Sequence, residues 1–520
     1  MKKLFKAIPV LISCLAMLFV MAGCGGGDAS SSVTDTGNTL VYGSQDYTSI
    51  NPALYEHGEI NDLLFAGLTA HDENNQVVPA LAEKWEYDEK SKTYTFTLRE
   101  GLTFHDGEPL TSADVEFTLK TILDEKNGSE IVTNYKDIVK IECPDEKTVA
   151  ITLSDSNTGF LDYMTIGILP KHLLDGKDIT TDSYNQNPVG AGPYKLVEWD
   201  QGQSITMEKF DGFYAGAAKI DRVIFKIVPD SDAKAAQINA GDIDMAQVTP
   251  KAAADLTGSQ DYTIYNMKTA DYRAVAYNFA ADNIFKKYPE LSNILSYGID
   301  RESIIKSVLL GEGEAAYSPI QKNEFNDETM EKFAYDPGKM QSMLESEGWK
   351  KNNAGYYEKN GDELRFVISA MADDQVRVDM AKMCAAKWQE QGINVTAESK
   401  KEMDWAGQDC CIIGWGSPFD ADDHTYKVFT TDAGDNYTGY SNPAADKPLA
   451  DARHTTDKDK RKELYGNFLE AMTEHMPYTF IAYIDADYAV KNNITGITEN
   501  TVLGHHGVGI FWNIHQWEMK

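Results

Sequence analysis

Val223 to Val248 read VIFKIVPDSDAKAAQINAGDIDMAQV, and this stretch decides the fold class. Val223 to Val228 form a mostly apolar run with the length of a buried strand. A short helix is expected through Ala233 to Ala240, closed by Gly241, and DIDMAQV then forms a second strand. A strand, a helix and a strand in this order predict parallel pairing, which is typical of α/β proteins.

The rest of the chain also alternates between strand-like and helix-like patterns. In TYTFTL (Thr93 to Leu98), apolar residues recur at every second position, which predicts a half-buried strand. Further elements are a helix opened by the capping box Thr111 to Asp114, a helix that begins at Asp336-Pro337, a hairpin at Asn360-Gly361, a helix over 374–391, and strands in INVTAE and DCCIIGW. The fold is therefore mixed α/β, with more than one lobe.

The N-terminus indicates export from the cytoplasm. Three lysines precede an apolar core, Ala7 to Val20, which is too short to span a bilayer comfortably. Met21-Ala22-Gly23-Cys24 resembles the bacterial lipobox, so residues 1–23 are expected to be a lipoprotein signal peptide and Cys24 the lipidated first residue of the mature chain. The alternative is a signal peptide without lipidation. Residues 24–38, rich in Gly, Ser and Thr, are expected to be a flexible tether.

Charge and cysteine usage exclude several classes of protein. The net charge is −33 and no local basic patch is present, so neither nucleic acid nor anionic lipid headgroups are expected partners. The negative charge either keeps an exported protein soluble or attracts cationic solutes. Cys143, Cys384, Cys410 and Cys411 are too few for a disulfide framework in a chain of this length.

No catalytic motif is present. The sequence lacks G-x-S-x-G, H-E-x-x-H, the phosphate-binding G-x-x-x-x-G-K-[ST], and G-x-G-x-x-G after a strand, so we expect neither an enzyme nor a cofactor. The acidic run DADDH, from Asp420, lacks the glycine and the glutamate of an EF-hand loop. His505, His506 and His515 fit either metal ligands or ordinary C-terminal residues, and no metal site is predicted.

Segments spread over most of the chain resemble one family. They are INPALYEHGEINDLLFAGLTAHD, VVPALAEKWEYDEKSKTYTFTLREGLTFHDGEPLTSADVEFTL, NPVGAGPYKLVEWDQGQSITMEKFDGFYAG, INAGDIDMAQV, LSYGIDRESIIKSVLLGEG, GYSNPAADKPLADAR and RKELYGNFLEAMTEHMPYTFIAY. In order and spacing the chain resembles the family 5 extracytoplasmic solute-binding proteins of peptide and nickel ABC importers.

That resemblance implies a two-lobed periplasmic-binding-protein type II fold, with the ligand enclosed between the lobes by hinge closure. The first lobe would comprise residues 39–268 and 486–520, with an extra subdomain at about 72–186. The second lobe would comprise residues 269–485.

The resemblance also suggests ligand-binding residues. The segment after the Gly-Trp pair lines the cleft in this family, which makes Trp415, Phe419 and Asp420 candidates. Tyr55 matches a wall residue of nickel-chelate binders, and each of these aromatics has core packing as its alternative. Arg273 is a candidate partner for a ligand carboxylate, with an ordinary surface position as the alternative.

The ligand itself is not settled by these matches. Pro418 stands where peptide binders have the aspartate that pairs with the α-ammonium group, and Asp420 is the next carboxylate in reach. WGSPFDADDH is more similar to the nickel-chelate pattern, but the arginines of the extra subdomain are missing, and Ala433 replaces the expected histidine. Both signatures are therefore incomplete.

We therefore expect a monomeric, lipid-anchored receptor on a Gram-positive cell surface that delivers a peptide-like solute to an ABC permease and its ATPase subunits. Binding of nickel or another metal chelate is the alternative within the class. A surface hydrolase and a sensor or adhesin without transport are the alternatives from other classes.

Overall fold

The computed structural model describes residues 38–55 and 58–520. The predicted signal peptide, the lipidation site Cys24 and all but the last residue of the tether lie outside the described residues. Within the described part, no helix combines the length and the apolar character needed to cross a bilayer.

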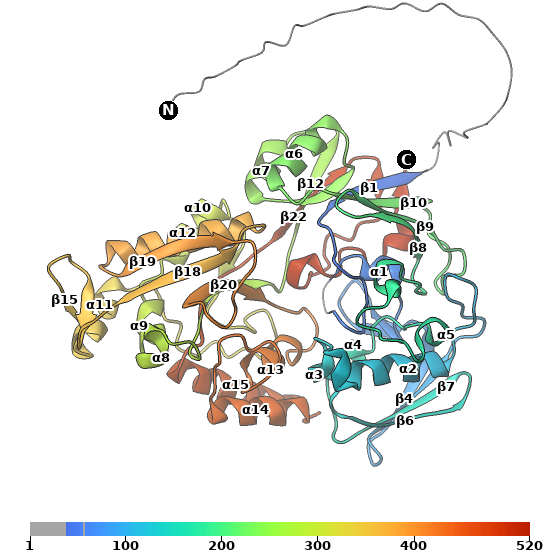
Figure 1. Ribbon diagram of the computed structural model, residues 1–520, viewed down its shortest axis with the longest axis horizontal. Helices are drawn as coiled ribbons and strands as arrows, with labels where there is room; N and C mark the ends of the chain where they lie inside the picture. The colour runs from blue at the N-terminus through green and yellow to red at the C-terminus, as the bar shows by residue number, and fades with distance from the viewer. Residues whose placement is uncertain (1–37, 56–57) are drawn as a thin grey trace, which may run out of the picture. The chain divides into compact units, whose positions relative to one another are not determined.

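A seven-stranded sheet gathers strands from distant parts of the chain, in the order β12-β22-β11-β1-β10-β9-β8. In Figure 1 the blue β1, the green β8 to β10 and the red β22 belong to this one sheet. β1 pairs in parallel with both β10 and β11, and the remaining neighbours are antiparallel. The strands are β1 (Thr39–Ser44), β8 (Tyr194–Asp200), β9 (Ser204–Lys209), β10 (Arg222–Ile227), β11 (Met245–Val248), β12 (Tyr262–Met267) and β22 (Ala486–Lys491).

The predicted strand–helix–strand unit consists of β10, α6 (Ser231–Ala240) and β11. The side chain of Asp230 caps α6 by accepting a hydrogen bond from the backbone N–H of Ala233 at 2.8 Å. Gly241 ends the helix with φ of 78°, a left-handed conformation that glycine adopts without steric cost. The predicted parallel orientation is confirmed, and β1 lies between the two strands as their common partner.

An antiparallel four-stranded sheet, in the order β4-β5-β7-β6, follows in the region predicted as an extra subdomain. The predicted capping box is confirmed: Thr111 and Asp114 open α2 (Ser112–Leu123). The strands are β4 (Ala82–Asp88), β5 (Thr93–Leu98), β6 (Ile138–Asp145) and β7 (Thr148–Leu153). The short helices of this region and its approach are α1 (Asn61–Leu64), η1 (Glu125–Asn127), α3 (Val132–Tyr135), α4 (Phe160–Tyr163), α5 (Lys171–Leu174) and η2 (Ser183–Gln186).

A six-stranded sheet, in the order β14-β21-β13-β20-β18-β19, forms the second half of the described structure. Every residue of β13, β20 and β21 is buried, as expected for central strands that are packed on both faces. The strands are β13 (Tyr272–Tyr277), β14 (Glu314–Ala315), β18 (Arg365–Met371), β19 (Asn394–Lys400), β20 (Cys410–Trp415) and β21 (Tyr478–Tyr483).

Helices and short strands complete the described structure. The helices are α7 (Pro250–Leu256), α8 (Ile284–Lys287), α9 (Leu291–Ser296), α10 (Arg301–Val308), α11 (Pro337–Ser346), α12 (Gln375–Glu390), α13 (Asp423–Phe429), α14 (Pro443–Arg453), α15 (Lys458–Glu474), η3 (His505–Gly507) and η4 (Ile514–Gln516). The short strands are β2 (Thr69–His71), β3 (Val77–Pro79), β15 (Lys350–Lys351), β16 (Tyr357–Lys359), β17 (Asp362–Glu363), β23 (Ile494–Thr495) and β24 (Glu518–Met519).

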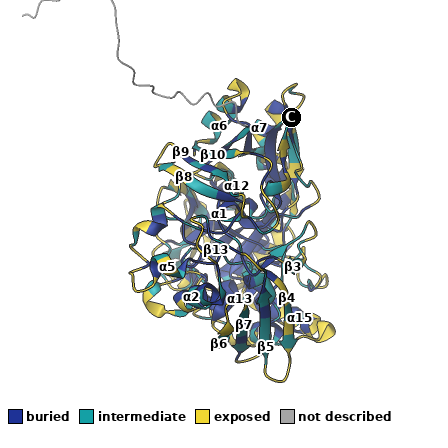
Figure 2. Cartoon of the chain, turned by 90° about the vertical axis from the view of Figure 1, so that its right-hand side faces the viewer, coloured by how far each residue is buried: buried dark blue, intermediate teal, exposed yellow. Residues whose placement is uncertain are grey.

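The chain crosses between the two large sheets twice. It leaves the seven-stranded sheet after Met267 and enters the six-stranded sheet at Tyr272, then returns between Tyr483 and Ala486. Each sheet has its own apolar core, and Figure 2 shows buried residues filling the interior while exposed residues gather in peripheral loops. The exact lobe boundaries given above, 268/269 and 485/486, stay a prediction.

Candidate functional site

The segment after Trp415 lies where the end of β20 meets the first crossing and the C-terminal region. Gly416 has φ of 153°, and a Cβ at this position would lie 1.9 Å from the carbonyl oxygen of Ala270. The carbonyl oxygen of Gly416 accepts a hydrogen bond from the backbone N–H of His505 at 2.9 Å. Only glycine fits this contact, so the backbone itself fixes the position of the segment.

Trp415 is buried, with 5% of its surface exposed. Its ring centroid lies 5.4 Å from that of His424, 5.5 Å from that of His505 and 6.1 Å from that of Tyr437. The tryptophan therefore joins a group of rings contributed by the six-stranded part and the C-terminal region. Its role as a wall of the ligand site stays a prediction.

Phe419 contacts the other half of the structure directly. Its ring stacks on that of His71, with centroids 3.8 Å apart and an interplanar angle of 8°. His71 is held in turn by Asp162, whose Oδ1 lies 2.9 Å from the His71 Nε2. Phe419 thus reaches from the segment after β20 to β2.

Asp420 is paired within the protein. Arg461 donates from Nη1 to Oδ2 at 2.9 Å and from Nη2 to Oδ1 at 2.6 Å, and the N–H of Asp422 also donates to Oδ1 at 2.8 Å. Burial raises the pKa of Asp420, and the Arg461 guanidinium opposes that shift. Contact between Asp420 and a solute amine stays a prediction, and such an amine would share a carboxylate that already has a counter-charge.

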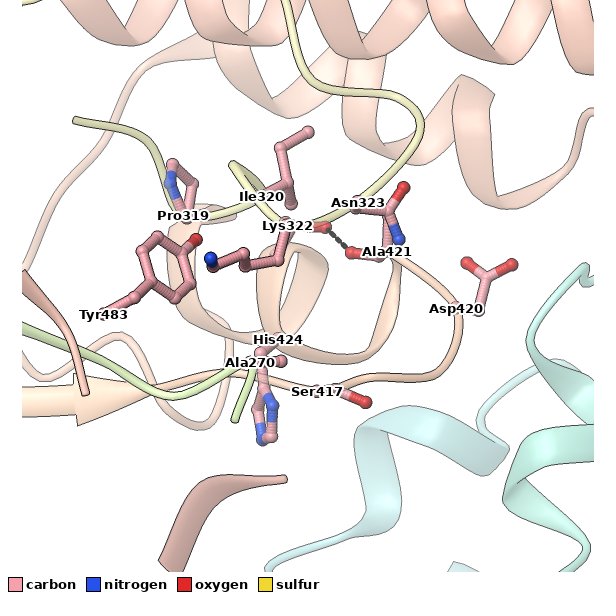
Figure 3. A pocket seen from close by; sticks show the side chains of 11 residues that line it. Ala270, Pro319, Ile320, Lys322, Asn323, Ser417, Asp420, Ala421, His424 and Tyr483 are labelled. Atoms are coloured by element: carbon pink, nitrogen blue, oxygen red, sulfur yellow. Dashed lines mark hydrogen bonds between the residues drawn. The ribbon is translucent and has the colours of Figure 1, made fainter. Parts of the chain in front are cut away.

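Asp420 also borders a small pocket of about 20 Å³. Figure 3 shows Lys322 and Tyr483 on one side of this pocket and Asp420 on the opposite side. The Lys322 ammonium lies 5.8 Å from the centroid of the Tyr483 ring. A space of this size holds about one water molecule, so the pocket is too small for an organic solute.

Arg273 lies on β13 and is 4% exposed, so the alternative of an ordinary surface position is wrong. Its Nη1 donates to Oδ1 of Asp271 at 2.6 Å, and the same oxygen lies 2.9 Å from Nδ1 of His505. Asp374 is a more distant counter-charge, 3.9 Å from Nη2. The buried charge of Arg273 is tolerated inside the sheet because the buried carboxylate of Asp271 neutralises it. Pairing with a ligand carboxylate stays a prediction.

Tyr55 is half-buried and packs against the core of the first half of the structure. Its backbone N–H donates to the carbonyl oxygen of Asn51 at 3.1 Å, which closes the turn in NPALY. Tyr55 is not among the described residues that line the 250 Å³ cavity beside Phe419. Its role as a pocket wall stays a prediction.

A cavity of about 250 Å³ lies beside Phe419. Its described lining comes from Pro52 and from the segments 58–80, 165–167, 193–214 and 501–515, and Phe419 is the only described lining residue from the six-stranded part. The aromatic lining residues are Phe65, Phe213, Tyr214, Phe419 and Trp512. The charged or titratable ones are Glu59, Asp62, His71, Asp72 and His515.

Sequence reasoning identified Phe419 but missed the other residues of this cavity. Glu59 and Asp62 lie inside INPALYEHGEINDLLFAGLTAHD, a segment that matches the family as a whole. The segment holds four acids, Glu56, Glu59, Asp62 and Asp72, and its sequence alone does not distinguish the ones that line the cavity. Their convergence with Trp512 and His515, some 450 residues later, has no local signature.

A buried polar cluster, here called the Asp422 network, links the two halves near the cavity. Arg453 donates to Asp422 from Nε at 2.9 Å and from Nη2 at 2.7 Å, and the hydroxyl of Tyr163 donates to the same carboxylate at 2.7 Å. Nη1 of Arg453 reaches the carbonyl oxygen of Thr133 at 3.2 Å. Asp422 is only 1% exposed, so these bonds connect the region of α3 and α4 to α13 and α14 away from solvent.

This arrangement defines a two-lobed α/β binding protein: two large sheets, two crossings between them, and a cavity beside the contact between the halves. Residues 76–438 match the family model of the bacterial extracellular solute-binding proteins, family 5 Middle. The chain therefore belongs to family 5 of the bacterial extracellular solute-binding proteins. Proteins of this family bind solutes for ABC importers outside the cytoplasm, and they are transport proteins rather than enzymes.

Individual relatives cover nearly the whole chain. The oligopeptide-binding protein AppA of Bacillus subtilis is 28% identical, covering 99% of this chain and 99% of AppA. The structure of NikZ from Campylobacter jejuni in complex with Ni(L-His) matches with a TM-score of 0.88 and 35% identity, covering 92% of this chain and 99% of NikZ. The structure of AppA with a nonapeptide matches with a TM-score of 0.84 and 28% identity, covering 93% of this chain and 99% of AppA.

Proposed function

We propose that this protein captures a small peptide-like solute in the cavity beside Phe419 and delivers it to the permease of an ABC importer. The observation that carries the proposal is the cavity itself. Its volume of about 250 Å³ is lined by segments of one half together with Phe419, the only described lining residue of the other half. Small-molecule sites commonly lie where two parts of a structure meet.

The cavity volume restricts the size of the solute. Sites for small ligands typically have volumes of about 300–1,000 Å³, and this cavity is slightly below that range. A solute of one to a few amino-acid residues fits such a volume, whereas an extended oligopeptide exceeds it. We therefore propose a dipeptide-sized ligand rather than a long peptide.

Hinge closure is part of this proposal. The stacking of Phe419 on His71 joins the halves at the cavity, and the Asp422 network joins them through residues that do not line it. These contacts support a closed arrangement in which the solute is enclosed. Phe419 lines this cavity as the sequence analysis predicts, whereas Tyr55, Trp415, Asp420 and Arg273 are not among its described lining residues, and their ligand contacts stay predictions outside this proposal.

A nickel chelate of a small amino acid is the second candidate. It is favoured by the 35% identity to NikZ, whose structure contains Ni(L-His). The adjacent rings of His505 and His506, with centroids 3.9 Å apart, add imidazoles near Trp415. Among the residues that the structure describes, however, no group of three or more His, Cys, Asp or Glu side chains is arranged to hold a bare metal ion.

We further propose that the protein is a monomer anchored through a lipid on Cys24, on the surface of a Gram-positive cell. A basic n-region, a short apolar core and a small-residue run before Cys24 support this proposal. Two or more acyl chains give a stable membrane anchor. Mass spectrometry of the N-terminal peptide tests it: a diacylated Cys24 is expected, and an unmodified mature N-terminus at another residue contradicts it.

Native mass spectrometry of the full-length protein in mild detergent, combined with metal analysis, tests the proposed ligand. A co-purified series of short peptides is the expected result. Stoichiometric nickel with an organic chelator supports the second candidate instead. An empty protein that shows no thermal shift with either dipeptides or nickel–histidine contradicts both.

A further inference from the structure

Acidic residues outnumber basic ones in the described lining of the 250 Å³ cavity. Three carboxylates, those of Glu59, Asp62 and Asp72, line it, and no lysine or arginine is among the described lining residues. Burial lowers the pKa of His515, so this histidine is neutral near pH 7. Such a lining disfavours a negatively charged solute group and favours a positive one.

Glu59 is the first of two lining carboxylates whose pKa is raised by burial. The hydroxyl of Tyr42 donates to its Oε1 at 2.8 Å. Burial raises the pKa of Glu59 to about 7, and the positive charge of Lys234 opposes the shift only in part. Lys234 does not line the cavity, and burial lowers its own pKa. The tyrosines Tyr42, Tyr47 and Tyr488 are the other titratable groups that face Glu59, besides Asp62.

Asp62 provides the second carboxylate, from the short helix α1. No hydrogen bond from a described residue to its carboxylate is present, although it lines the cavity. Burial raises its pKa to about 6, and His71 is the charge that opposes this shift. His71 is itself engaged by Asp162 at 2.9 Å. Asp62 is thus a carboxylate at a cavity wall that accepts no hydrogen bond from the residues the structure describes.

Aromatic rings complete the lining. Phe65, Phe213, Phe419 and Trp512 contribute apolar walls, and Tyr214 is already contacted by the Arg99 guanidinium, 5.5 Å from its centroid. The faces of aromatic rings attract ammonium and guanidinium groups, most strongly where water is excluded. A carboxylate beside such rings adds a charge-assisted hydrogen bond to an ammonium or guanidinium group.

We propose, on the basis of the function proposed above, that Glu59 and Asp62 form a subsite for a positively charged group of the solute, an ammonium or a guanidinium. This subsite lies on the first half of the structure and is separate from Asp420, whose charge Arg461 already balances. The subsite makes the protein selective for basic peptide-like solutes. A bound cation also favours the ionised forms of both carboxylates, so binding near neutral pH releases protons.

Competition within a dipeptide library tests the subsite. The full-length protein in detergent is incubated at pH 8 with an equimolar library, and bound dipeptides are identified by native mass spectrometry. Dipeptides that contain lysine or arginine are expected to be enriched by about tenfold or more, the effect of one desolvated charge-assisted bond. Glu59→Gln and Asp62→Asn should abolish the enrichment while dipeptides still bind, and Glu89→Gln, an exposed acid elsewhere, should keep it.

The pH dependence of the unmodified protein provides a test that needs no variant. At pH 5 both carboxylates are protonated, because their pKa values are about 7 and 6, whereas lysine and arginine keep their charge. The enrichment is therefore expected at pH 8 and lost at pH 5. Binding without enrichment at pH 8, or enrichment that persists at pH 5, overturns the subsite and leaves the proposed function standing. Binding of no dipeptide at all overturns the proposed function and the subsite with it.

Discussion

Replacement of Asp420 by asparagine separates a structural role of this residue from a role in ligand binding. Removing one partner of a buried ion pair costs about 3–5 kcal/mol, because the remaining charge stays buried. Asp420 and Arg461 retain 13% and 7% of their side-chain surface, and asparagine keeps one acceptor oxygen. We therefore expect Asp420→Asn to lower the free energy of unfolding by about 3 kcal/mol, the lower end of this range.

Urea unfolding followed by tryptophan fluorescence measures this loss, with Asp432→Asn, at an exposed position of the same region, as the matched control. A double-mutant cycle with Arg461→Met should show that most of the loss is coupling between the two residues. The affinity for the solute, measured on folded protein, should change much less than stability. An unchanged unfolding curve together with weakened binding refutes this reasoning and assigns Asp420 to the ligand.

Three further predictions concern other residues. Tyr163→Phe removes a hydrogen bond to a buried carboxylate and should lower unfolding stability by about 1.5–3 kcal/mol in the same urea assay; no change would show that the Asp422 network does not depend on it. Gly416→Ala should prevent correct folding, judged by soluble yield and circular dichroism, because its Cβ would overlap a carbonyl oxygen, whereas Gly434→Ala has room and should fold normally. For Glu59 the folded-state pKa of about 7 lies above the ordinary 4.5, so the unfolded state loses its proton first and stability should fall as the pH rises from about 4.5 to 7. Melting temperatures across this range should show the fall in the native protein and a smaller one in Glu59→Gln; identical profiles would contradict the shift.

Local features were predictable because they depend on neighbouring residues. The capping box at Thr111, the Asp336-Pro337 helix start and the Asn360-Gly361 turn are all present as predicted. Each rests on hydrogen bonds or backbone angles within a few residues. The insertion of β1 between β10 and β11 was not predictable from the unit itself, because β1 lies about 180 residues earlier in the chain.

The candidate site was predictable only in part. The sequence singled out the segment after Trp415, and Phe419 from that segment does line the cavity. The interpretation of Arg273 as a surface residue was wrong, because its charge is neutralised by Asp271 inside the sheet. An arginine two residues from an aspartate has no pattern that distinguishes such burial from exposure.

By itself, the sequence determined the α/β class and the family, because strand and helix periodicity and the ordered family segments are visible in the order of the residues. The export signal before Cys24 stays a prediction. Only the tertiary structure decided which charges are balanced and which face the cavity. Asp420 and Asp62 look alike in sequence, yet Arg461 neutralises one, and the other borders a space without a donor from the described residues. The physical reason is that the desolvation of a carboxylate and its pairing with a cation depend on groups brought together from distant parts of the chain. A local pattern of residues therefore does not predict either of them.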